Sequence, residues 1–361
     1  MKVLLVGDFP PPHGGVAVHV EVLFRAVRAA GGICEVLDIG KGQLPADGVI
    51  PAGNTARFTR LLGSYAARGY QLHVHTSGAN PKSWMLAGIC AAAGAVSGKP
   101  PLITFHSGLG PAWLGESSVR RHVAGAVASR FGRVIAVSDG IRDCMLSCGV
   151  PAERVEVLAA FSNSFLEPGA PPREFAAARA GAQPLFVAML APGKVYGHEI
   201  LLDAFARVRA QVPSARLALY GLGSDAVRAE GVTGFGELHR PAALAVMAGG
   251  DVFVRPTLAD GDSVSVREAL ALGRVVVATR VGNRPPEVRL VAPGDPAALA
   301  AGMLEAAAEV VARPLRPAAP PPAADCIQRL LELYGHTAAA TSAKATATAA
   351  PEARCAASAA S

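Results

Sequence analysis

The chain has 361 residues, of which 51% are hydrophobic and only 5% aromatic. This length favours two domains, whose cores must be built mainly from Ala, Val and Leu. Residues 1–180 carry 17 Lys and Arg against 12 Asp and Glu, whereas residues 181–361 carry 17 against 16. A basic first half is compatible with an anionic partner such as a phosphate group or an anionic membrane, and equally with ordinary surface variation.

The six cysteines have neither the spacing of a disulfide framework nor that of a zinc site. The apolar run at the N-terminus is too short for a signal peptide and is stopped by Asp8. We therefore expect buried thiols in a reducing, cytoplasmic environment.

The first elements form a βαβ pattern. Residues 3–6 are a continuous apolar run, as expected for a strand buried on both faces. A Pro-rich loop ends in Gly14 and Gly15, an apolar period over 16–27 predicts a helix, and 34–37 predicts the next strand. Backbone N–H groups at such a helix N-terminus favour an anion or a close backbone approach, although a plain turn explains a glycine pair equally well.

The alternation continues through both halves of the chain. Strands are predicted at 72–75, 102–106, 134–137, 185–190 and 215–220, and helices at 84–93, 141–148 and 201–212. Such alternation predicts a parallel, doubly wound sheet in each half, with ligands at the carboxyl ends of the strands. His106 ends one of these strands and Lys194 follows another. On spacing alone His106 is more often a plain loop residue than a ligand contact, and Lys194 is equally well explained by a solvated loop residue. The loose dinucleotide motif at Gly221 lacks room for a crossover helix, so we do not predict a nicotinamide site.

The stretch 260–273 lies between predicted strands at 251–255 and 275–278 and combines an acidic glycine loop with a helix. Two explanations of Glu268 remain open. In one, the helix begins near Ser263 and Glu268 is free to bind a ligand. In the other, Ser265 and Glu268 form a capping box, and Glu268 is structural.

Composition divides the chain further. We assign 1–168 to an N-terminal Rossmann-like domain on the acceptor side, 169–184 to a Pro-rich linker and 185–312 to a C-terminal Rossmann-like domain. Residues 313–336 hold a Pro-rich segment and a short amphipathic helix, and 337–361 form an Ala/Thr-rich tail that we expect to be disordered.

Four motifs, taken in their order along the chain, resemble those of a known family. They are the loop with Gly14-Gly15, the strand ending in His106, the Lys194 loop, and two acids eight positions apart, Asp260 and Glu268. Together they resemble the retaining glycosyltransferases of family 4 (glycosyl transferases group 1). The resemblance implies an α/β fold with two Rossmann-like doubly wound parallel-sheet domains (GT-B) facing across a cleft.

The resemblance also implies a function and roles. The enzyme would be of hexosyltransferase type, moving a sugar from a nucleoside-diphosphate donor to a glycan or lipid-linked acceptor, with surface polysaccharide biosynthesis as the expected process. Nucleic acid is not an implied partner, and neither a metal nor another cofactor is implied. The implied catalytic residues are His106, Lys194, Asp260 and Glu268, and the implied substrate-binding residues are Gly14, Gly15, Asp262, Ser263, Val264 and Arg267. In the implied scheme His106 and Asp260 contact the sugar, Lys194 the diphosphate and Glu268 the ribose.

The chain departs from the family pattern in three places. Asp260 stands where Glu is usual, Met189 stands where an Arg is common, and two extra residues separate Lys194 from Gly197. Arg255, Arg267 and Arg142 are the candidates to replace the missing positive charge. Two other functions therefore stay open: a nucleotide-sugar epimerase of the same architecture and a non-catalytic sugar-binding relative.

Overall fold

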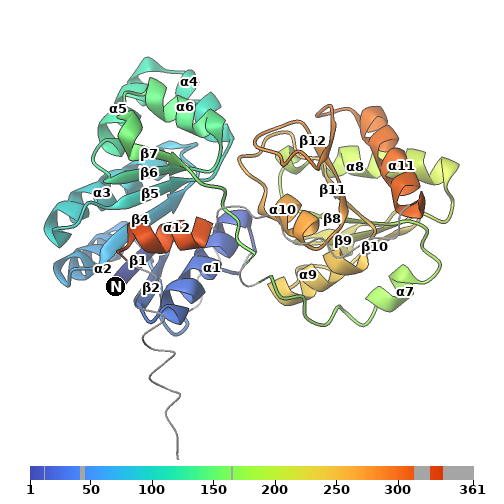
Figure 1. The fold of residues 1–361 in the computed structure, drawn as a ribbon, viewed down its shortest axis with the longest axis horizontal. Helices are drawn as coiled ribbons and strands as arrows, with labels where there is room; N and C mark the ends of the chain where they lie inside the picture. The colour runs from blue at the N-terminus through green and yellow to red at the C-terminus, as the bar shows by residue number, and fades with distance from the viewer. Residues whose placement is uncertain (12, 41–44, 164–165, 313–325, 336–361) are drawn as a thin grey trace, which may run out of the picture.

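The computed structural model describes residues 1–11, 13–40, 45–163, 166–312 and 326–335. Figure 1 shows two domains side by side, each a parallel sheet flanked by helices. The predicted tail over 337–361 and the Pro-rich segment lie outside the described residues.

Within the described residues the N-terminal domain has a seven-stranded sheet of order β3-β2-β1-β4-β5-β6-β7, and each pairing is parallel. Its strands are β1 Lys2–Gly7, β2 Ile33–Asp38, β3 Val49–Pro51, β4 Gln71–Thr76, β5 Leu102–Phe105, β6 Arg133–Ala136 and β7 Val155–Val157. Its helices are α1 Gly15–Ala29, α2 Thr55–Ala67, α3 Pro81–Ser97, α4 Leu109–Gly115, α5 Ser118–Ala128 and α6 Asp139–Ser147.

The C-terminal domain has, among the described residues, a six-stranded parallel sheet of order β10-β9-β8-β11-β12-β13. Its strands are β8 Leu185–Met189, β9 Arg216–Tyr220, β10 Val232–Gly234, β11 Val252–Arg255, β12 Val275–Thr279 and β13 Arg289–Val291. Its helices are α7 Phe175–Arg179, α8 His198–Gln211, α9 Arg240–Gly249, α10 Val264–Ala271 and α11 Pro296–Ala312.

The predicted fold class is confirmed. The apolar run of β1 is fully buried from Val3 to Val6, as a strand covered on both faces requires. Strand order reverses between β1 and β4 in the first sheet and between β8 and β11 in the second. Such switch points open crevices at the carboxyl ends of the strands, where doubly wound sheets bind ligands.

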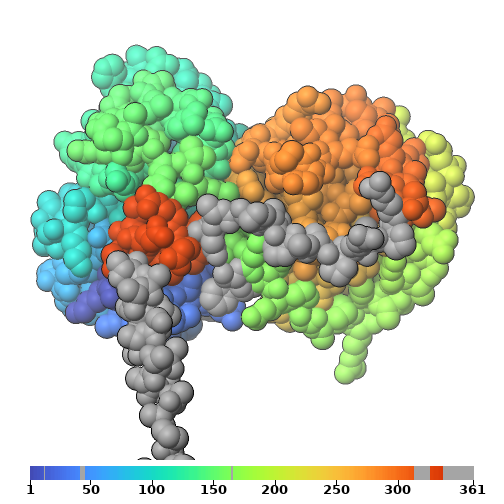
Figure 2. Space-filling view, viewed as in Figure 1, coloured from blue at the N-terminus to red at the C-terminus, as the bar shows by residue number. Residues whose placement is uncertain are grey.

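Two segments belong to domains that the sequence pattern did not indicate. The predicted linker 169–184 contains α7, whose Phe175 packs in the core of the C-terminal domain. The closing helix, α12 Cys326–Leu333, lies instead on the N-terminal lobe (Figure 2), where Ile327 and Leu330 enter the core. None of the helices in the described ranges is long and apolar enough to cross a membrane.

Candidate active site

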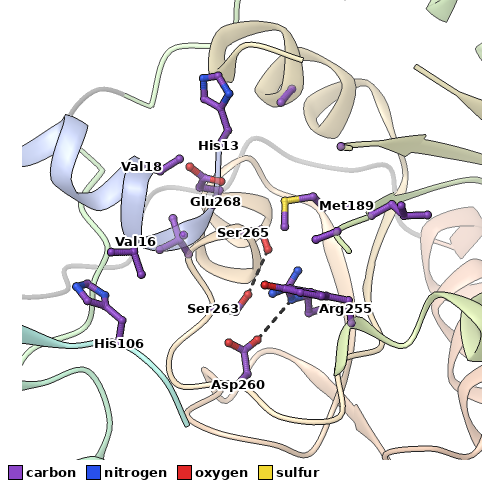
Figure 3. Close-up of a pocket in the computed structure, with 18 of the residues that line it drawn as sticks. His13, Val16, Val18, His106, Met189, Arg255, Asp260, Ser263, Ser265 and Glu268 are labelled. Carbon is purple, nitrogen blue, oxygen red and sulfur yellow. Dashed lines mark hydrogen bonds and ion pairs between the residues drawn. The ribbon is translucent and has the colours of Figure 1, made fainter. Parts of the chain in front are cut away.

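A pocket of about 590 Å³ lies between the two domains (Figure 3). Loops that follow β1, β5, β8, β9 and β11 line it, so it is built from the carboxyl ends of strands in both sheets. This is the place that the doubly wound topology reserves for a ligand.

Two helix N-termini meet at this pocket. Gly14 is the N-cap of α1 and Ser263 that of α10, and both residues line the pocket. Neither terminus has a side-chain cap among the described residues. A Cβ at Gly15 would lie 3.9 Å from a methyl group of Val264, which shows how closely the two termini approach. Uncapped N–H groups and two positive helix ends make the pocket favourable for an anion.

The carboxylate of Asp260 is held by two arginines. Arg284 Nη2 donates to Oδ2 at 3.1 Å and Arg255 Nε at 3.4 Å, while the Gly261 amide donates to Oδ1 at 3.0 Å. Burial opposes ionisation, but the two guanidinium groups outweigh it and hold the pKa of Asp260 below its ordinary value. Asp260 is therefore a fixed anion on the pocket wall.

Glu268 forms a buried ion pair rather than a capping box. Helix α10 begins at Val264, and the Glu268 carboxylate accepts from Arg240 Nη2 at 2.8 Å and Nε at 3.2 Å. Burial raises the pKa of Glu268, and Arg240 opposes that rise. The geometry matches the explanation in which the helix begins near Ser263 and Glu268 faces the pocket.

Asp262 is the third acid of the loop and points away from solvent. Arg267 Nε lies 2.8 Å from each oxygen of its carboxylate. Burial raises the pKa of Asp262, while Arg267 acts in the opposite direction. The pair ties the loop to the first turns of α10, so Asp262 has a structural role in addition to its place on the pocket wall.

Glycines let the two domains approach backbone to backbone. A Cβ at Gly108 would lie 1.8 Å from the Asp260 carbonyl oxygen, and a Cβ at Gly261 would lie 2.3 Å from that of His106. Real Cβ atoms do not approach so closely, so side chains at either position would force the domains apart. The acidic loop and the His106 loop are in contact because both positions are glycine.

His106 is half-buried and belongs to a histidine cluster of the N-terminal domain whose other members are buried. Its Nε2 lies 3.1 Å from Nδ1 of His75, whose ring contacts that of His73 with centroids 4.2 Å apart. His73 is hydrogen-bonded to Tyr334 just beyond α12, and the ring of His19 packs against His106 with centroids 5.3 Å apart. The cluster thus runs from the closing helix to the pocket.

These histidines are neutral at neutral pH. Burial lowers the pKa of His19 to about 4 and that of His73 to about 3. Burial also lowers the pKa of His75 and of His106 well below 6.5, and the neighbouring rings add to the effect. His106 therefore presents a neutral imidazole to the pocket.

The structure brings most of the predicted site residues together. Eight of them line the pocket: Gly14, Gly15, His106, Asp260, Asp262, Ser263, Val264 and Glu268. Lys194 and Arg267 are not among the pocket-lining residues that the structure describes. Lys194 is exposed, although its neighbours Pro192 and Val195 do reach the pocket.

Other pocket residues escaped the sequence prediction. Arg240 enters from the start of α9, and His13 meets Glu237 across the domain boundary, with Nδ1 and Oε1 3.8 Å apart. Arg284 supports Asp260 from a loop behind it. Single arginines and loop acids of this kind carry no spacing signal. In the described part of the chain, no group of three or more His, Cys, Asp or Glu is arranged to hold a metal ion.

Two family models match the chain. The model "Glycosyltransferase Family 4" covers residues 13–159, and the model "Glycosyl transferases group 1" covers residues 182–309. No curated protein matches the chain in a sequence search.

Solved structures with the same fold cover nearly the whole chain. HepE from Anabaena, solved with UDP-glucose, has a TM-score of 0.67 at 18% identity and covers 93% of this chain and 100% of its own. Sucrose-phosphate synthase from Thermosynechococcus elongatus has a TM-score of 0.63 at 19% identity, covering 97% of this chain and 100% of its own. WaaG, a glycosyltransferase involved in lipopolysaccharide biosynthesis, has a TM-score of 0.61 at 15% identity, covering 87% of this chain and 92% of its own. The chain belongs to the group 1, family 4 glycosyltransferases and has their two-domain GT-B fold.

Proposed function

We propose that the protein is a retaining, metal-independent glycosyltransferase of hexosyltransferase type. It takes a sugar from a nucleoside-diphosphate donor and transfers it to a glycan or lipid-linked acceptor in surface polysaccharide biosynthesis. The observation that carries the proposal is the meeting of two uncapped helix N-termini with a fixed carboxylate, Asp260, and a neutral imidazole, His106, in one interdomain pocket. HepE was solved with UDP-glucose, so UDP-sugars are the first donors to try.

The proposed reaction has one bond exchange. The bond between the anomeric carbon and the β-phosphate oxygen breaks, and its electron pair stays on the phosphate. The acceptor hydroxyl oxygen bonds to the same face of the anomeric carbon, and its proton passes to the departing phosphate. The N-termini of α1 and α10 stabilise the charge that develops on that phosphate.

The pocket side chains orient the donor in this scheme. His106 and Asp260 hydrogen-bond the sugar hydroxyls, and Glu268 binds the ribose with its carboxylate oriented by Arg240. Asp260 is already fixed by Arg255 and Arg284, so little ordering is left for the bound state.

A donor panel tests the proposal. UDP-, GDP-, ADP- and dTDP-sugars are incubated with glycan and lipid-linked acceptors, and release of the nucleoside diphosphate is measured. We expect acceptor-dependent release from one donor class and a loss of at least tenfold in kcat/KM for Glu268→Ala. Absence of release from every donor would refute the enzymatic activity, and full activity of Glu268→Ala would refute the role of that carboxylate.

The same assay separates the alternatives. An epimerase consumes donor without an acceptor and releases the free nucleoside diphosphate or an isomerised sugar. A non-catalytic relative binds the donor in calorimetry but releases nothing. The glycosyltransferase alone requires both substrates.

We also propose a cytoplasmic protein with peripheral contact to an anionic membrane. The support is the basic first half of the chain and two apolar side chains on α5, Val119 and Val123, which are 69% and 50% exposed. Co-sedimentation with vesicles containing phosphatidylglycerol tests the contact, and equal recovery with neutral vesicles would contradict it.

A further inference from the structure

The positive side chains that are candidates to bind the donor diphosphate differ in what already neutralises them. Arg240 is paired with Glu268, and Arg267 is paired with Asp262. Arg142, on α6, lies 2.6 Å from Asp139 and is also bonded to Asp143. Each of these arginines therefore already has a carboxylate of its own. Lys194 is exposed and lies outside the lining of the pocket.

Arg255 is different because it shares its carboxylate. Asp260 is the acid next to it, and Arg284 holds the same Oδ2 oxygen at the shorter distance. Two guanidinium groups and one carboxylate leave one positive charge in excess at this wall. Since Arg284 also bonds Thr257 and Asn283, its donors are largely occupied, and the excess charge is carried toward the pocket by Arg255.

The guanidinium of Arg255 is buried and held in place. The residue is 8% exposed, and its guanidinium carbon lies 5.6 Å from the centre of the Tyr196 ring. Its one hydrogen bond recorded within the described residues leaves from Nε, at 3.4 Å, so its terminal amines have no protein acceptor there. Figure 3 shows Arg255 on the pocket wall, facing Asp260. A buried, preoriented cation with unused donors is suited to a bidentate contact with phosphate.

The Lys194 loop is shaped to present Tyr196 rather than Lys194. The Leu258 amide donates to the Val195 carbonyl at 2.7 Å, which anchors this loop to the acidic loop. Gly197 has a φ of 68°, and a Cβ there would lie 2.1 Å from the Pro256 carbonyl oxygen. The close approach turns the ring of Tyr196 toward Arg255 and leaves Lys194 in solvent.

We infer that Arg255, held by Tyr196 and Asp260, is the side chain that binds the donor diphosphate, in place of Lys194. This inference rests on the proposed function. In the reaction above, the β-phosphate gains the electron pair of the broken bond, and Arg255 offsets that charge together with the N-terminus of α10. A role of Arg255 also explains why Met189 can stand where the family commonly has an Arg, because the positive charge comes from the end of β11 instead of from the end of β8.

Binding of nucleoside diphosphates in the absence of sugar tests the inference. UDP, GDP, ADP and dTDP are first compared on the wild-type protein by calorimetry, and the tightest is used with its nucleoside as the phosphate-free control. A charged hydrogen-bonded contact of about 1.5–3 kcal/mol corresponds to a loss of roughly 10- to 100-fold in affinity for Arg255→Met. The nucleoside, which has no phosphate, should bind Arg255→Met and wild type within about threefold.

Matched variants separate a direct contact from an indirect one. Lys194→Met should bind the diphosphate within about threefold of wild type. Asp260→Asn should bind it as well as wild type or more tightly, because it removes a competing anion without touching the phosphate. Arg255→Lys should regain part of the loss by restoring the charge without the planar fork. If Arg255→Met does not fold, Tyr196→Leu, which removes only the ring beneath the guanidinium, should still weaken diphosphate binding more than nucleoside binding.

The outcomes are distinguishable. If none of the four diphosphates binds the wild-type protein, the proposed function fails and the inference fails with it. If one binds, and Arg255→Met binds it equally well or Lys194→Met shows the larger loss, the inference about Arg255 fails alone.

Discussion

The histidine cluster predicts that this protein loses stability as the pH falls from about 6.5 toward 4. The imidazoles of His19 and His73 are neutral when folded, with pKa values of about 4 and about 3. In the unfolded chain each has an ordinary pKa near 6.5. At pH 5 the unfolded state therefore binds about two more protons at these residues than the folded state does, and linkage makes unfolding more favourable.

The size of the effect follows from the shifts. Each such histidine costs ~1.4 kcal/mol per pH unit below about 6.5, so at pH 5 it costs about 2 kcal/mol. His19 and His73 together remove about 4 kcal/mol from a free energy of unfolding that is typically ~5–15 kcal/mol. His75 and His106, whose pKa values are also lowered, act in the same direction. Carboxyls with raised pKa values, such as Glu268, act in the opposite direction.

Comparison of variants isolates the histidine contribution. Urea unfolding is measured from pH 5 to pH 7.5 for wild type, His19→Phe and His122→Gln. His19→Phe keeps a ring against His106 but removes one titrating group, so the slope of stability against pH should fall by about 1 kcal/mol per unit between pH 5 and 6. His122 is exposed, and its variant should keep the wild-type slope. Equal slopes for wild type and His19→Phe would show that His19 is already protonated in the folded protein.

Three further outcomes follow from the pocket contacts. Gly108→Ala should lower kcat at least tenfold, because its methyl group would lie 1.8 Å from the Asp260 carbonyl oxygen and push the His106 loop and the acidic loop apart; unchanged kinetics would contradict the close approach. Arg240→Leu should lower the free energy of unfolding by about 3–5 kcal/mol at pH 8 and by less at pH 5, because it leaves the Glu268 carboxylate buried and unpaired when ionised. A loss that is the same at both pH values would show that Glu268 is not ionised in the folded variant. Arg284→Met should raise the KM for the donor more than it changes the Kd for the free nucleoside diphosphate, because it removes a hydrogen bond to Asp260 and leaves the phosphate contact intact. A larger change in the Kd for the diphosphate would assign Arg284 to the phosphate.

The sequence predicted the central strands well because burial on both faces leaves a continuous apolar run. Residues 3–6 and 275–278 are such runs, and both are strands in the structure. The edge strands β3, β7, β10 and β13 have three residues each, too few to display any period, and were not predicted. Helix α11 was missed for a different reason: it is so rich in alanine that its two faces differ little.

At the site, the sequence predicted positions better than side-chain directions. Strand ends are defined by their neighbours, so Gly14, His106 and Glu268 could be placed at one edge of the two sheets. Whether a loop lysine turns toward a pocket or toward solvent depends on contacts from distant segments. For Lys194 that contact is the approach of Gly197 to Pro256, which no local pattern indicates.

The charge arrangement also limits where the acceptor proton can go. Asp260 is paired with two arginines and has a lowered pKa, so it is a weak base. Glu268 is tied to Arg240, and the lowered pKa of His106 makes its imidazole a poor proton acceptor at neutral pH. The departing phosphate gains negative charge as the anomeric bond breaks, and it lies on the face that the acceptor must approach for retention. Asp260 and His106 are weakened as bases and the Glu268 carboxylate is held by Arg240, so the pocket favours the proposed route, in which the leaving group itself takes the proton.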